Sequence, residues 1–250
     1  MLNIVIPMAG LGSRFSDEGY KDPKPLISIH GVPMIKLVID NLTPKCGHRF
    51  IFICQRKHVK EYGLKRLFNA WAPNNEVIEL DGITEGAACT VYSAKPLINN
   101  DDPVMIANSD QYVDVVIDDY LSTMDGRSLD GLIMTMKADD PKWSFVGLDS
   151  EGLIDRVVEK EVISDEATVG IYNFRSGMQL VAAIESMFKK GLRVNGEYYV
   201  APAYNEMINI GLKVGFYNVG EVGAGMYGLG IPDDLSCFLD LPISRKITKL

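Results

Sequence analysis

The chain has few of the residues that build metal clusters, disulfide frameworks or catalytic triads. Its 250 residues include only four cysteines and three histidines. The cysteines are scattered without a C-x-x-C pair, and the histidines have no partners at metal-ligand or triad spacing. The sequence therefore predicts neither a zinc site nor a disulfide framework, and a reduced, cytoplasmic protein is expected.

Positive charge and long apolar runs are also scarce. Lysine and arginine number 25 against 33 aspartates and glutamates, which gives a formal net charge of -8. Nucleic-acid binding requires a broad basic surface, so no nucleic-acid partner is expected. The first apolar run, Ile4 to Ile6, is too short to cross a bilayer, and the N-terminal segment lacks the pattern of a signal peptide. No membrane partner is expected either.

What the chain does have is the composition of a globular protein, with 47% hydrophobic and 23% charged residues. Its length predicts one domain with a sizeable core. The expected strands are 3–7, 50–54, 76–80, 104–107, 132–136, 145–148, 153–159, 169–174 and 214–219. The expected helices are 34–41, 59–71, 86–97, 178–189, 199–210 and one that begins near Pro232. A hairpin turn is expected at 149–152, and the tail from Ser244 is expected to be loose.

This order of elements predicts the fold class. Strands that alternate with helices up to Ala107 favour a parallel sheet with helices on both faces. The closely spaced strands after Gly131 add antiparallel pairs. We therefore expect a single α/β domain with a Rossmann-like (GT-A-like), mostly parallel mixed sheet flanked by helices.

A glycine turn follows the first expected strand directly. It consists of Ala9, Gly10, Leu11, Gly12 and Ser13, with Arg14 next. Glycines let the backbone approach phosphate oxygens, and the exposed N–H groups of such a turn point at them. The turn is not a dinucleotide fingerprint, because position 15 is Phe15, and it lacks the G-K-[ST] ending of a P-loop. Arg14 adds a cation of the kind that binds a triphosphate.

Lys24 is a second cation near this turn. It stands between Pro23 and Pro25. The two prolines hold the chain extended, so this lysine is a positioned cation rather than a solvated one. The turn and the lysine together predict a site for a nucleoside triphosphate.

Three segments together resemble the signature of the sugar-phosphate nucleotidylyltransferases, which is G-x-G-[ST]-R, P-K-P-[LM] and G-[KR]-P-[ML]-[IL]. This chain has GLGSR at 10–14, PKPL at 23–26 and GVPMI at 31–35. Later segments match in order: EGAA at 85–88, NSD at 108–110, EK at 159–160, GIY at 170–172 and GIPDDL at 230–235. The resemblance implies an enzyme of EC 2.7.7 type that transfers a nucleoside monophosphate to a phosphorylated acceptor.

The resemblance also implies roles for residues of this chain. Arg14, Lys24 and Lys160 are the expected catalytic residues. The expected nucleotide-binding residues are Ala9, Gly10, Leu11, Gly12, Ser13, Asp81, Glu85, Gly86, Ala87 and Ser109. The expected acceptor-binding residues are Lys160, Gly170 and Glu197. Asp110 is expected to bind Mg²⁺, because it follows a strand at the carboxyl edge of the sheet, where open α/β folds bind ligands.

Position 228 bears on how the metal ion is bound, and position 81 bears on which nucleobase is recognised. The family often reads W-x-D-[IL]-G-T-P near its end, and this chain has Gly228 at the aspartate position. Glu221 is the nearest sequence candidate for a second metal ligand. Asp81, five residues before Gly86, aligns with a residue that reads the base in many pyrimidine-specific members. A carboxylate only accepts hydrogen bonds, so Asp81 favours the N4 amine of CTP over UTP or dTTP; a simple turn there is an equal alternative.

The sequence thus predicts a Mg²⁺-dependent cytidylyltransferase with a nucleotide-binding half, 1–130, and an acceptor-binding half, 131–250. It is similar to the bacterial capsule-type enzymes that transfer CMP from CTP to phosphoglutamine. A hexose-1-phosphate uridylyl- or thymidylyltransferase is the first alternative. A glycosyltransferase, against which Lys24 argues, and a non-catalytic nucleotide-binding module, which Gly228 keeps open, are the others. A homo-oligomer is compatible with the sequence, and the acceptor is not specified by it.

Overall fold

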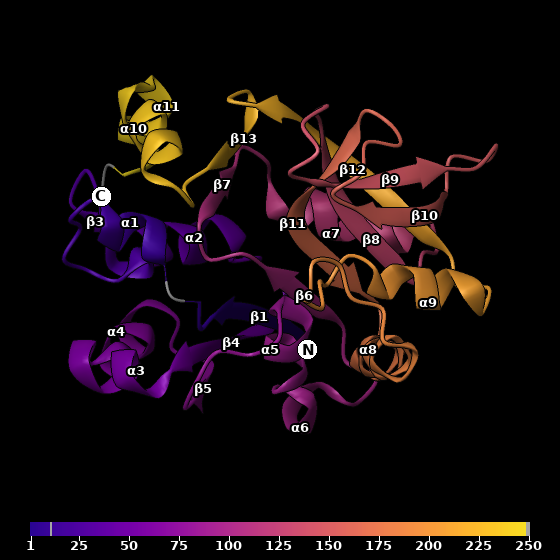
Figure 1. Ribbon diagram of the computed structural model, residues 1–250, viewed down its shortest axis with the longest axis horizontal. Coiled ribbons are helices and arrows are strands. Elements are labelled where there is room, and N and C mark those ends of the chain that lie inside the picture. The colour runs from indigo at the N-terminus through magenta and orange to yellow at the C-terminus, as the bar shows by residue number, and fades with distance from the viewer. Residues whose placement is uncertain (11, 249–250) are drawn as a thin grey trace.

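A computed structural model of the chain describes residues 1–10 and 12–248 (Figure 1). These residues form a single α/β domain built on an 11-stranded mixed sheet, with helices on both of its faces. A separate ribbon of two strands consists of β2 (Ser28–Ile29) and β3 (Val32–Pro33). The fold class is the one that the alternation of strands and helices predicts. Leu11, one of the predicted nucleotide-binding residues, lies outside the described residues.

A block of four parallel strands, in the order β5-β4-β1-β6, begins the sheet. The strands are β1 (Leu2–Met8), β4 (His48–Gln55), β5 (Asn75–Leu80) and β6 (Val104–Ala107). Central strands that are buried on both faces are continuous apolar runs, as β1 and β4 are. The four strands predicted here are confirmed, with small differences at their ends. Because the strands are parallel, the loops after β1 and β6 open on the same edge of the sheet.

Beyond β6 the sheet becomes mixed. β11 runs antiparallel to both β6 and β8, and β12 runs parallel to β8. β9 and β10 form the predicted hairpin, in which Asp149 accepts hydrogen bonds from two backbone N–H groups of the turn. Two short strands that the sequence did not indicate, β7 and β13, pair at the end of the sheet. The bounds are β7 (Gln111–Val113), β8 (Gly131–Lys137), β9 (Ser144–Leu148), β10 (Ile154–Glu159), β11 (Glu166–Phe174), β12 (Val214–Val222) and β13 (Gly225–Gly228).

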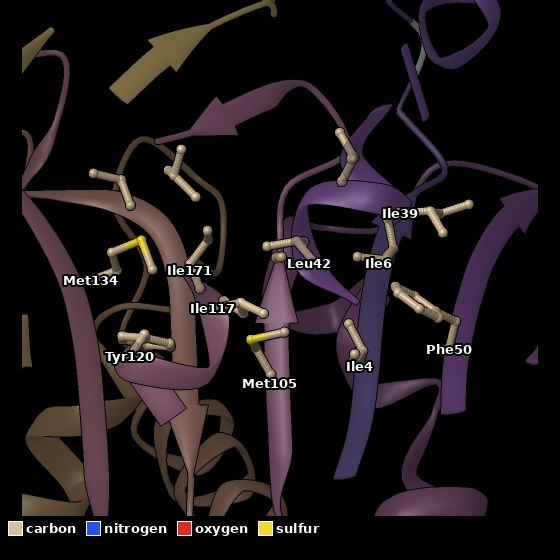
Figure 2. Close-up of a cluster of buried hydrophobic side chains, with 14 of the residues drawn as sticks. Ile4, Ile6, Ile39, Leu42, Phe50, Met105, Ile117, Tyr120, Met134 and Ile171 are labelled. Carbon is tan, nitrogen blue, oxygen red and sulfur yellow. The ribbon is translucent and has the colours of Figure 1, made fainter. Parts of the chain in front are cut away.

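Helices form a layer on each face of the sheet. One layer contains α2 (Met34–Leu42), α3 (Arg56–Tyr62), α4 (Leu64–Trp71) and α7 (Ile117–Gly126). Figure 2 shows its core, where Ile4 and Ile6 of β1 pack near Ile39 and Leu42 of α2. The other layer contains α5 (Ala87–Tyr92), α6 (Lys95–Ile98), α8 (Gly177–Lys190) and α9 (Ala203–Asn209).

The last two helices pack on the first part of the chain. α10 (Pro232–Asp240) and α11 (Pro242–Ile247) lie beside β13, near α1 (Ser13–Asp17) (Figure 1). A separate apolar cluster joins Phe15 and Ile27 to Leu235 and Phe238. The segment that contains η1 (Lys24–Leu26) is thereby held between α2 and the C-terminal helices. This packing fixes the position of Lys24.

Several predicted elements are corrected by the structure. The helix expected over 59–71 is two helices, because Gly63 has a φ of +61° and separates α3 from α4. The helix expected over 86–97 is also divided, and Pro96 lies in the first turn of the short α6, which begins at Lys95. The helix expected over 199–210 begins only at Ala203. The tail from Ser244, expected to be loose, instead lies in α11 as far as Ile247, after Pro242 at its first turn.

Among residues 1–10 and 12–248, no helix has both the length and the apolar character that crossing a bilayer requires.

Candidate active site

The glycine turn lies at the carboxyl end of β1, within the parallel block. Gln55, at the end of the neighbouring β4, donates a hydrogen bond from Nε2 to the carbonyl of Ala9 at 2.6 Å. Ala9 is buried, whereas Gly10, Ser13 and Arg14 are exposed. The turn is therefore fixed at Ala9 by this hydrogen bond, whereas Gly10, Ser13 and Arg14 are open to solvent. Sequence reasoning missed Gln55, although a polar residue that ends an apolar strand at this edge was a usable signal.

Gly12 brings Lys24 close to this turn. Its φ is +62°, and a Cβ built on it would lie 3.2 Å from the Cβ of Lys24. Glycine avoids both the backbone strain and the crowding that another residue would introduce here. Pro23 is extended, with φ -62° and ψ 145°, as expected for a stiff segment. The structure thus places the predicted cation beside the predicted phosphate-binding turn.

Lys24 and Asp110 form an ion pair. The Nζ atom of Lys24 lies 2.6 Å from Oδ2 of Asp110, and their side chains are 25% and 21% exposed. Asp110 lies in the loop between β6 and β7, where its carbonyl accepts a hydrogen bond from the N–H of Leu229 at 2.8 Å. Ser109, the residue before it, is buried. The predicted catalytic lysine and the predicted Mg²⁺ ligand are therefore in direct contact, although a bond between them was not expected.

The surroundings of Asp110 are compatible with a divalent cation. A Cβ built on Gly230 would lie 2.6 Å from Oδ2 of Asp110, so glycine leaves the room that this carboxylate occupies. The described part of the chain contains no group of three or more His, Cys, Asp or Glu side chains arranged for a metal. Mg²⁺ does not need such a group, because one or two carboxylates and substrate phosphates usually bind it. Mg²⁺ binding by Asp110 stays a prediction.

Asp81 has a partner that the sequence did not reveal. Arg56, at the start of α3, forms two hydrogen bonds to its carboxylate and a third, of 3.1 Å, to Glu79. The hydrogen bond from Arg56 is the main cause that lowers the pKa of Asp81. A carboxylate has about four lone-pair positions, so Asp81 keeps acceptors for another donor. The reading of cytosine by this 78% exposed side chain stays a prediction.

The predicted nucleobase segment, 85–88, is hydrogen-bonded to a loop of the second half of the chain. The N–H of Tyr198 donates to the carbonyl of Glu85 at 2.8 Å, and its own carbonyl accepts from Ala88 at 3.0 Å. Gly86 has a φ of +121°, and a Cβ there would lie 2.4 Å from the Tyr198 carbonyl oxygen. Arg193 adds an ion pair of 2.6 Å to the Glu85 carboxylate. This contact requires glycine at position 86.

A cavity of about 250 Å³ opens between this loop and the sheet. Its lining includes Ala87 and Gly170, which were predicted to bind nucleotide and acceptor respectively. Gly170 has a φ of +83°, and a Cβ there would lie 2.0 Å from Nδ2 of Asn108. Polar groups from β9, β10 and β11 also face the cavity: Ser144, Glu159, Thr168 and Tyr172. Acceptor binding in this cavity stays a prediction.

Lys160 reaches the rim of the cavity. Its Nζ donates to the hydroxyl of Tyr199 at 2.7 Å, and Tyr199 lines the cavity. This hydrogen bond raises the pKa of Lys160, so the ammonium is charged at neutral pH. Burial raises the pKa of the Tyr199 phenol, and nearby Glu197 adds to the effect. Lys160, Tyr199 and Glu197 therefore form one polar group, of which the sequence missed Tyr199.

Glu159 is a further carboxylate in the cavity. It accepts a hydrogen bond from the hydroxyl of Ser144. Burial raises its pKa, and the bond from Ser144 opposes this shift. A partly buried carboxylate of this kind is suited to hydroxyl or amine donors of a ligand.

Glu221, the predicted second metal ligand, is an exposed residue near the end of β12. Its N–H donates to the carbonyl of Ala224 at 2.9 Å, and its register partner on β8 is Lys137. Its role at the metal stays a prediction.

Comparisons with known proteins bear on the family and the fold of the chain. The family model described as nucleotidyl transferase matches residues 4–198. The structure of a nucleoside-diphosphate-sugar pyrophosphorylase from Vibrio cholerae RC9 is similar at a TM-score of 0.81 and 24% identity, over 95% of this chain and 100% of that one. The inositol-1-phosphate CTP transferase from T. maritima is similar at a TM-score of 0.71 and 15% identity, over 99% and 96%. At these identities the two structures show the fold alone.

Curated relatives are similar at the same low level of identity. The bifunctional protein GlmU of Methanococcus aeolicus is 23% identical over 219 residues, which is 78% of this chain and 50% of the relative. The chain spans about half the length of the curated relatives it matches. The names of these similar proteins do not mention phosphoglutamine, so the comparisons do not support that acceptor. The family model, which covers most of the chain and the glycine turn, shows that the chain belongs to the nucleotidyl transferase family.

Proposed function

We propose that this protein transfers CMP from CTP to a phosphorylated small molecule and releases pyrophosphate. The observation that carries the proposal is the meeting of Lys24 and Asp110, at 2.6 Å, beside a glycine turn. The two residues are far apart in the sequence and have no shared structural role other than this edge of the sheet. A glycosyltransferase has no need of a lysine held on such a stiff segment.

The positions of the side chains suggest how the reaction proceeds. The N–H groups of the turn and Arg14 bind the triphosphate. Mg²⁺ held by Asp110 would offset the charge of the phosphates. Lys160 orients the phosphate of the acceptor for in-line attack on the α-phosphorus, and Lys24 stabilises the charge that develops there. Positioning and electrostatics carry such a transfer, so a covalent enzyme intermediate is not needed.

The acceptor cavity favours a substrate rich in hydroxyl groups. Ser144, Glu159 and Tyr172 supply hydrogen-bonding groups, and Lys160 supplies a cation at the rim. A phosphorylated sugar or cyclitol suits this combination of donors and acceptors. The names of the similar proteins point to the same class, since they include an inositol-1-phosphate and a sugar-nucleotide enzyme.

A uridylyl- or thymidylyltransferase that acts on a hexose 1-phosphate is the second candidate. The Arg56–Asp81 pair supports it as well, because it offers donors to the O4 atom of uracil or thymine. A similar structure is a UDP-glucose pyrophosphorylase in complex with UDP-glucose.

Pyrophosphate release distinguishes these candidates. The protein would be incubated with CTP, UTP, dTTP or GTP, each with inositol 1-phosphate, hexose 1-phosphates or phosphoglutamine. We expect CTP with a phosphorylated polyol to be fastest. Faster release from UTP or dTTP identifies the second candidate, and no release from any pair refutes a transferase acting on these acceptors. Asp81→Asn should reduce the preference for CTP, with Asp101→Asn, on a distant exposed loop, as the control.

A further inference from the structure

Two carboxylates pack against one short segment of backbone, 228–230. A Cβ built on Gly230 would lie 2.6 Å from Oδ2 of Asp110, and one built on Gly228 would lie 3.2 Å from Oδ2 of Asp234. Two residues of extended chain span at most about 7 Å, so the two glycine Cα atoms are close together. The two carboxylates therefore lie against the same short segment and come from different elements, the loop after β6 and the first turn of α10.

Asp234 has no structural partner that explains its position. It is only partly exposed, and no hydrogen bond or ion pair from its carboxylate occurs among residues 1–10 and 12–248. Its neighbour Asp233 is exposed and is equally placed to favour the helix dipole. Asp234 instead lines a cavity that shares Lys142 and Trp143 with the acceptor cavity. It thus lies next to the region where the reaction takes place.

A cation of the chain already lies against one of these carboxylates. The ammonium of Lys24 contacts Asp110 at 2.6 Å, with both side chains largely covered. In the proposed reaction the same lysine must act on a phosphate, and the same carboxylate must hold a divalent ion. The ion pair therefore neutralises Lys24 and Asp110 in the absence of substrate. In the proposed reaction their partners are instead a phosphate and a divalent ion.

We infer that Asp110 and Asp234 together form a two-carboxylate site for a divalent cation, and that the ammonium of Lys24 is its resting occupant. This inference rests on the proposed function, because it assigns the metal ligands of that site. Gly228 lacks a carboxylate of its own and leaves space beside the backbone, and Asp234 of α10 fills that space. A divalent ion displaces Lys24 from Asp110 and so frees the lysine to contact the triphosphate.

Binding of Mn²⁺ to the full chain without nucleotide, measured by water-proton relaxation, tests the inference. Asp234→Asn should weaken Mn²⁺ binding by about tenfold or more, as loss of a group that supports a metal does. The matched control Asp233→Asn removes the same charge from the same turn of α10 and should leave binding unchanged. Lys24→Ala should tighten binding by about threefold, because it removes a competing cation from a partly exposed pair.

A second variant keeps the test independent of damage to α10. Gly228→Asp in an Asp234→Ala background places a carboxylate in the vacated space and should restore Mn²⁺ binding that Asp234→Ala alone loses. Equal binding by the Asp234→Asn and Asp233→Asn proteins, or failure of this rescue, overturns the role of Asp234. Unchanged binding by Lys24→Ala overturns the role of the lysine as resting occupant.

The Mn²⁺-binding experiment and the pyrophosphate-release experiment can fail independently of each other. Loss of Mn²⁺ binding in Asp234→Asn, together with no pyrophosphate release from any substrate pair, would support the metal site and refute the proposed function. Pyrophosphate release by the unaltered protein, with no effect of Asp234→Asn on Mn²⁺ binding, would do the reverse.

Discussion

Gly86→Ala is the substitution whose effect can be worked out most directly. Gly86 has a φ of +121°, which an L-residue rarely adopts, and its added Cβ would lie 2.4 Å from the oxygen and 2.6 Å from the nitrogen of Tyr198. Both are backbone atoms, so no flexible side chain can move away. Adoption of this φ costs about 1–3 kcal/mol. Separation of the two segments also removes the backbone hydrogen bonds of 2.8 and 3.0 Å between them, at about 1 kcal/mol each.

We therefore expect Gly86→Ala to lower the free energy of unfolding by about 3–5 kcal/mol, measured by urea denaturation. Because residues 85–87 and 197–199 are joined there, the KM values for nucleotide and acceptor should rise together. Gly82→Ala is the control, since a Cβ at Gly82 has nothing within 4 Å and no unusual φ. A difference between the two variants below about 0.5 kcal/mol, within the range of neutral surface changes, would refute the reasoning.

Two further predictions concern charged groups of the site. Lys24→Ala should lower turnover by about 10²- to 10³-fold, as loss of one transition-state contact does, while the nucleotide Kd from calorimetry changes little. The control is Lys21→Ala, which replaces an exposed lysine of the same loop and should preserve turnover. Burial raises the pKa of Glu159, so the folded state retains its proton longer than the unfolded chain, and stability is lost as pH rises through the folded pKa. Glu159→Gln should accordingly lose less stability than the unaltered protein as the pH rises above the ordinary glutamate pKa of about 4.3, measured by urea titrations. An identical loss in both proteins would contradict this.

The sequence predicted the parallel block and its edge because the signals there are local. An apolar strand followed at once by Gly10, Gly12 and Arg14 can be recognised without knowing the rest of the fold. The position of Asp110 after β6 then follows from the parallel arrangement, since both loops open on one edge. The same reasoning predicted the hairpin at 149–152, where Asp149 supplies the turn.

Helix ends and long-range pairs were harder to predict. The periodicity of 59–71 is continuous, and only the left-handed backbone of Gly63 divides it. Residues after Ser244 are polar at the end of the chain, yet α11 forms because Pro242 begins it and its Ser244 is fully buried. The Arg56–Asp81 and Lys160–Tyr199 pairs join residues distant in sequence. No sequence periodicity predicts such pairs, so only the tertiary structure shows that Asp81 forms an ion pair with Arg56.

The apolar cluster that joins Phe15 and Ile27 to Leu235 and Phe238 has a consequence for the order of folding. The N-terminal part of a chain leaves the ribosome first, and contacts between distant segments form slowly. The parallel strands can pair before α10 is synthesised, but the segment that carries Lys24 then lacks its apolar cover. The segment that carries Lys24 therefore reaches its final packing late in folding, when the last helices close over the first loop.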